Sequence, residues 1–221
     1  MNYLAHGWQF ADEPYVLAGT AAPDWLSVID RKVRLRSKTA AEYVSDPDPV
    51  VAAIARGIVQ HHADDGWFHA TPIFNELCLR FAVHIRDSLP GDEGFRPSFL
   101  GHILVEMLLD RALAEDNPRR LDQYYAALAA LDPATTEKAI GHLATRPVDR
   151  LAALIPRFIN ERFPALAFNA LVPGGKVFLR TDDRDYFEQM LAVFAGESRF
   201  EPLATRSEEH TSELQSPYVI S

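Results

Sequence analysis

Helical spacing of apolar residues is the feature that most constrains the fold of this 221-residue chain. The first segment of this kind follows Asp48 and carries Val50, Val51, Ile54 and Ile58. Such a period is typical of an amphipathic helix that buries one face. Later segments open near a proline with acidic or polar neighbours, which suits the first turn of a helix. The sequence therefore predicts an all-α protein.

The predicted helices follow one another with short turns between them. They cover residues 48–69, 73–88, 97–114, 118–131, 133–144, 148–163 and 182–194. The only strand candidate is Lys176–Arg180, and one strand cannot make a sheet. We expect a single helical domain over residues 1–205. Residues 206–221 are expected to be a disordered, foreign tail, because Arg206–Ser216 is polar, aperiodic and resembles a translated sequencing adapter.

Composition and charge predict a cytoplasmic protein that binds neither membranes nor nucleic acid. No apolar run approaches the roughly 18 residues of a membrane span, and residues 1–10 lack the pattern of a signal peptide. The lone Cys78 suits a reducing compartment. A net charge of −9 disfavours contact with phosphate backbones. The local exception is a basic run, which is either a solvated face or a docking site for an anion or an acidic partner: Arg31, Lys32, Arg34, Arg36 and Lys38.

Two segments carry ionisable side chains at four-residue spacing on otherwise apolar helix faces. The first holds His61, Asp65 and His69, and the second holds His102, Glu106 and Asp110. This spacing places successive side chains on one face of a helix. Ionisable groups that face a core are costly unless they are paired or bound to metal. These two sets of three residues, called the two ladders below, predict a site for one or two divalent ions. Mixed nitrogen and oxygen ligands suit zinc, iron or manganese.

Four motifs, taken in order, resemble the acyl carrier protein phosphodiesterases. They are Met1-Asn2-Tyr3-Leu4-Ala5-His6, Asp24 after a glycine-containing turn, Gly57-Ile58-x-x-His61-x-x-x-Asp65, and Ile103-Leu104-x-Glu106-x-x-x-Asp110. The resemblance covers residues 1–114 and implies the helical fold of the HD-type metal phosphohydrolases. It also implies manganese as the metal, with iron or zinc as alternatives, and release of phosphopantetheine from a carrier protein. The chain departs from the family pattern at His69, Glu106 and Arg111.

These observations together predict a divalent-metal-dependent phosphodiesterase or phosphohydrolase acting on a carrier protein or a small phosphoester. The expected metal ligands are His6, Asp24, His61, Asp65, His69, His102 and Asp110. Glu106 and His69 are the expected catalytic acid and base. The substrate is expected to contact Arg31, Lys32, Arg34 and Arg36. Two alternatives remain open: a non-catalytic helical scaffold whose ladders are structural, and a hydrolase similar to the zinc phospholipases C.

Overall fold

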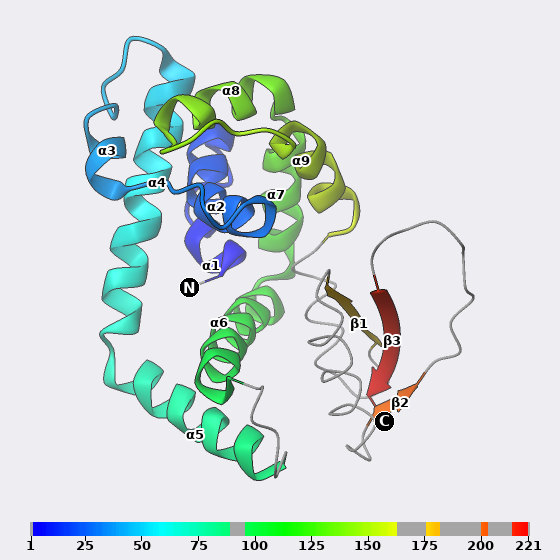
Figure 1. Ribbon diagram of the computed structural model, residues 1–221. Coiled ribbons are helices and arrows are strands. Elements are labelled where there is room, and N and C mark those ends of the chain that lie inside the picture. The colour runs from blue at the N-terminus through cyan, green and yellow to red at the C-terminus, as the bar shows by residue number, and fades with distance from the viewer. Residues whose placement is uncertain (1, 89–95, 163–175, 182–199, 203–213, 221) are drawn as a thin grey trace. The chain divides into compact units, whose positions relative to one another are not determined.

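A computed structural model describes residues 2–88, 96–162, 176–181, 200–202 and 214–220 (Figure 1). Internal contacts divide the chain into two compact units. The helical unit comprises residues 1–75 and 106–164, and the second unit comprises residues 76–105 and 165–221. The single domain expected over residues 1–205 stays a prediction.

In the described ranges 2–88 and 96–162, helices account for the secondary structure apart from one isolated bridge, so the predicted all-α class is confirmed. Their bounds are α1 Tyr3–Gly7, α2 Pro14–Ile29, α3 Ser37–Ala41, α4 Pro49–His69, α5 Pro72–Ser88, α6 Pro97–Asp116, α7 Pro118–Ala129, α8 Pro133–Leu143 and α9 Leu151–Asn160. The helices from α4 onward match the sequence prediction to within a few residues, whereas α1, α2 and α3 were not predicted. In the described ranges, none of the helices is both long and apolar enough to cross a membrane.

Local signals explain where the predicted helices begin. Asp48 accepts a hydrogen bond from the backbone N–H of Val50, at 2.8 Å, and so caps α4. Asp132 caps α8 in the same way through the N–H of Thr135, also at 2.8 Å. A proline follows each capping aspartate, at the first helical position, where its missing N–H costs nothing.

The core of the helical unit is built around α2 and α4, which run side by side (Figure 1). Gly19 of α2 faces Gly57 of α4, and the absence of side chains lets the two backbones approach closely. Helices α7, α8 and α9 pack onto α2. The largest fully buried side chains include Trp25, Leu17, Ile54, Ile58, Leu128, Ile140 and Ile155. This packing fixes the position of α1, which contacts α2, α4 and α7.

Three strands of the second unit form an antiparallel sheet in the order β1-β3-β2. They are β1 Lys176–Thr181, β2 Phe200–Pro202 and β3 Leu214–Ile220. The register pairs Thr181 with Leu214 and Phe200 with Ile220. The strand predicted at 176–180 is confirmed, but the expectation that it stands alone is wrong. The structure pairs residues 214–220 in β3, and the disordered tail expected over 206–221 stays a prediction. The helix predicted at 182–194 lies outside the described residues.

Candidate metal centre and comparison with known proteins

Three ionisable side chains meet in the helical unit where α1 contacts α4. His61 and Asp65 lie one turn apart on α4, as the sequence predicted, and His6 reaches them from α1. The rings of His6 and His61 stack with their centroids 4.1 Å apart. Asp65 Oδ1 lies 3.2 Å from His6 Nε2, and Asp65 Oδ2 lies 3.5 Å from His61 Nε2. One ligand atom from each residue can therefore face the same small volume.

A hydrogen bond to the backbone of Thr20 determines which ring nitrogen of His61 carries the proton and which one faces the cluster as an acceptor. Its Nδ1 lies 2.8 Å from the backbone carbonyl oxygen of Thr20, which can only accept, so Nδ1 carries the proton. Burial, and after it the nearby His6, lower the pKa of His61 to about 3. The ring is therefore neutral, and the lone pair of Nε2 faces the carboxylate of Asp65. Two acceptors facing each other are unfavourable unless a cation lies between them.

His6 is almost fully buried and faces two carboxylates. Its Nδ1 lies 3.4 Å from Asp64 Oδ2, while its Nε2 makes no hydrogen bond within the described residues despite its short distance to Asp65. Burial lowers the pKa of His6, but the contacts with Asp64 and Asp65 outweigh this and raise it to about 9. In the same way, burial opposes ionisation of Asp65, but its contact with His6 lowers its pKa below the usual range. The carboxylate of Asp65 is therefore ionised at neutral pH.

A second pair lies next to this cluster. His69 Nε2 is 2.9 Å from Glu106 Oε1 and 3.8 Å from Asp65 Oδ1. Both side chains are partly exposed to solvent. The predicted acid and base are thus in contact with each other, and their catalytic roles stay a prediction.

The other three predicted ligands lie on two elements, α2 and α6. Asp24 is on α2, where burial raises its pKa to about 7 although nearby His6 lowers it. Asp110 on α6 accepts hydrogen bonds from the backbone N–H groups of Leu4, at 2.9 Å, and Ala5, at 2.8 Å. It therefore holds the start of α1 in place. His102 lies on the part of α6 that belongs to the second unit. The structure does not group these three with His6, His61 and Asp65, and their roles as ligands stay predictions.

Two functional contacts were missed by sequence reasoning. The carbonyl of Thr20 orients His61, and backbone atoms leave no trace in a side-chain pattern. Asp64 was not among the predicted ligands; its side chain contacts His6 and accepts a hydrogen bond from Gln60 Nε2 at 2.7 Å. Neighbouring groups of this kind commonly orient metal-binding histidines.

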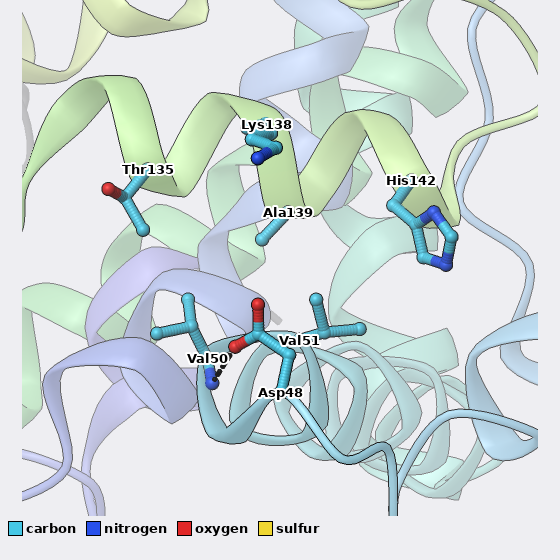
Figure 2. A pocket seen from close by; sticks show the side chains of 7 residues that line it. All are labelled: Asp48, Val50, Val51, Thr135, Lys138, Ala139 and His142. Carbon is cyan, nitrogen blue, oxygen red and sulfur yellow. Dashed lines mark hydrogen bonds between the residues drawn. The ribbon is translucent and has the colours of Figure 1, made fainter.

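A pocket of about 520 Å³ lies elsewhere, between the start of α4 and α8 (Figure 2). It is lined by Asp48, Val50, Val51, Thr135, Lys138, Ala139 and His142. Figure 2 shows the Asp48 carboxylate engaged with the N–H of Val50, so this helix start is already capped. None of the predicted site residues lines this pocket.

Comparison with known proteins shows that the C-terminal part of the chain is similar to methyltransferases. The profile of a family described as "Putative methyltransferase" matches residues 155–221. A tRNA (guanine-N(7)-)-methyltransferase from Rubrobacter xylanophilus is 48% identical over 44 residues, which is 20% of this chain and 20% of that protein. The chain thus spans about a fifth of the length of the curated relative it matches. No solved structure shows a significant match.

This similarity overturns the predicted relationship and function. It points to methyltransferases, so the assignment to the acyl carrier protein phosphodiesterases and to manganese-dependent hydrolysis is wrong. The scaffold and zinc phospholipase alternatives are not supported either. The expectation of an enzyme agrees with the comparison, which indicates a different reaction class. The four motifs behind the prediction lie in residues 1–114, and they carry no information about the matched segment.

Proposed function

We propose that this chain is an enzyme whose C-terminal region takes part in methyl transfer to a guanine base of tRNA. The match of residues 155–221 to a methyltransferase family carries this proposal, and the similarity to a tRNA (guanine-N(7)-)-methyltransferase supports the choice of substrate. A cytoplasmic location is part of the same proposal.

The reaction needs a methyl donor of the sulfonium class and no acid or base for its central step. The lone pair of guanine N7 forms a bond to the methyl carbon while the carbon–sulfur bond breaks and its electron pair goes to sulfur. The products are a neutral thioether and a base with a positive charge at the methylated ring. The protein therefore has to position the two reactants in line and exclude competing nucleophiles.

Two acidic residues follow β1 directly in the sequence and are our candidates for binding the base. Asp182 and Asp183 come after Thr181, the last residue of β1. A carboxylate is the natural acceptor for the ring N–H and amino groups of guanine. Asp182→Asn combined with Asp183→Asn should slow methyl transfer by roughly 10- to 100-fold, because a hydrogen bond to a charged group contributes about 1.5–3 kcal/mol.

The measurement is transfer of a labelled methyl group from S-adenosylmethionine to an unmodified tRNA transcript, with the product mapped at guanine N7. The double variant Asp12→Asn, Glu13→Gln is the control, since it removes the same charge from two exposed positions before α2. The wild-type chain should methylate the transcript, and the control should match it. A wild-type chain without transfer activity would contradict the proposed function.

We also propose that His6, His61 and Asp65 bind a divalent transition-metal ion. Two imidazole nitrogens and a carboxylate oxygen are suitable ligands for such ions. The Thr20 carbonyl fixes the orientation of His61, and His6 Nε2 lies 3.2 Å from an oxygen of the Asp65 carboxylate. A bound ion would place a positive charge between His61 Nε2 and the Asp65 carboxylate, which otherwise face each other as acceptors. It would take the place of the proton on His6 and would tie α1 to α4.

Metal binding should stabilise the helical unit. At a free ion concentration of about 100 times Kd, we expect a gain of about 2.7 kcal/mol and a rise in Tm of about 5–10 °C. The chain, freed of metal with a chelator, is melted with and without added Mn²⁺, Fe²⁺ or Zn²⁺. Asp65→Asn should remove most of the metal-induced shift, and Asp12→Asn should leave it unchanged. Comparing each variant with itself cancels any change in its metal-free stability, and equal shifts in all three proteins would contradict this site.

A further inference from the structure

A group of exposed basic side chains stands out on the otherwise acidic helical unit. The basic patch consists of Arg31, Lys32, Arg34 and Arg36, from the segment between α2 and α3, and Arg146, which follows α8. An isolated antiparallel bridge between Leu35 and Ala144 brings the two segments together. The N–H of Thr145 donates to the Arg34 carbonyl at 3.0 Å, and the N–H of Arg34 donates to Thr145 Oγ1 at 3.0 Å.

The first of these segments is anchored by alternate residues. Val33 and Leu35 are buried, while Arg34 and Arg36 are exposed between and beyond them. Alternation of this kind is typical of extended backbone, in which every second side chain points to the same side. His62 of α4 adds a contact at 2.8 Å between its Nε2 and the Leu35 carbonyl. The backbone that carries the cations is therefore held by the core.

The cations of the patch are available for a partner. None of them forms an ion pair with another residue in the described ranges, and all five are exposed. The guanidinium of Arg34 uses one donor, Nη1, on the Val33 carbonyl at 2.8 Å and keeps its others. The nearest carboxylate in the sequence, Asp30, accepts the backbone N–H of Lys32 at 2.8 Å. Several exposed positive charges on an anchored backbone suit a ligand with repeating negative charges.

We propose that the basic patch binds the phosphate backbone of RNA. This inference rests on the proposed function, which requires the chain to hold a tRNA. Arginine binds phosphate oxygens through two donors at once, and contacts of this kind position a nucleic acid without reading its sequence. The prediction that the chain binds no nucleic acid considered its total charge of −9, whereas binding depends on the local concentration of cations.

The test is equilibrium binding of an unmodified tRNA transcript to the full chain over a series of salt concentrations, without a methyl donor. Arg34→Gln combined with Arg36→Gln should weaken binding about tenfold at low salt and reduce the slope of log K against log salt by about 2. Arg56→Gln combined with Arg119→Gln changes the net charge equally at two exposed positions on α4 and α7, and it should bind like the wild type.

Three results would overturn the inference: no RNA binding by the wild-type chain, equal losses in the two double variants, or patch-dependent binding of polyglutamate without binding of RNA. Methyl transfer is measured separately on the same proteins. A chain that binds tRNA through the patch but transfers no methyl group would support the inference and contradict the proposed function. If the chain methylates tRNA but the patch variant binds tRNA as tightly as the wild type, the proposed function is supported and the inference about the patch is contradicted.

Discussion

Gly57→Ala is expected to lower the free energy of unfolding of the helical unit by about 3 kcal/mol. A β-carbon at this position would overlap the backbone carbonyl oxygen of Val16 and lie 2.7 Å from the Cα of Gly19. Both neighbours are backbone atoms of α2, so no side chain can rotate away to make room. The two helices would have to separate along their contact, which exposes apolar surface and loosens packing.

Urea unfolding followed by circular dichroism measures this loss, and another glycine of α4 provides the control. Gly66 is exposed, and a β-carbon there would meet nothing within 4 Å. Gly66→Ala should therefore stabilise the protein by up to about 1 kcal/mol, because alanine is the better helix former. A lower free energy of unfolding for Gly57→Ala together with a higher one for Gly66→Ala would support the close approach of α2 and α4. A neutral or stabilising Gly57→Ala would argue against it.

The helices that could be predicted from the sequence are those with a solvated face and a clear start. Helix α4 has both, since Asp48 and Pro49 mark its first turn and apolar residues recur along one side. Helix α2 lacks this pattern because it is buried on most sides: every residue from Val16 to Ala22 is buried. A helix buried all round shows no amphipathic period. Its small residues also resemble a turn, although here they permit close helix packing.

The part of the candidate site that could be predicted is local to one helix. Four-residue spacing places His61, Asp65 and His69 on one side of α4, and the structure agrees. The approach of His6 depends on how α1 packs, and neither propensity nor spacing contains that information. The same holds for Asp110, whose partners are more than a hundred residues away in the sequence.

The functional prediction failed because it rested on short motifs, whereas the reaction class is indicated by a similarity over a longer segment. The motifs in residues 1–114 each contain few fixed positions, and a pair of histidine and carboxylate residues one helical turn apart also occurs for structural reasons. In the segment that matches methyltransferases, the residue pattern yielded two helix predictions, 148–163 and 182–194, and one strand candidate, Lys176–Arg180. Local periodicity reports burial and secondary structure, and it does not distinguish one reaction class from another.

Asp110→Ala is expected to destabilise the helical unit by about 3–4 kcal/mol. The side chain is completely buried, and its two oxygens accept the N–H groups of Leu4 and Ala5. Alanine would leave both donors without a partner, and each buried, unsatisfied group costs about 1–3 kcal/mol. Asp110→Asn keeps one acceptor oxygen and should lose about half as much. Asp116→Ala, at an exposed position near the end of the same helix, should stay within about 0.5 kcal/mol of the wild type.

The same substitution tests whether Asp110 acts through α1 on the proposed metal site. His6 lies one residue beyond Ala5, so releasing the start of α1 should let its imidazole move away from Asp65. Asp110→Ala should therefore weaken metal affinity, measured by titration at a temperature where the variant is fully folded, by about tenfold or more. Asp110→Asn should have a smaller effect on both stability and affinity. Unchanged affinity in a clearly destabilised Asp110→Ala variant would show that the site does not depend on the anchoring of α1.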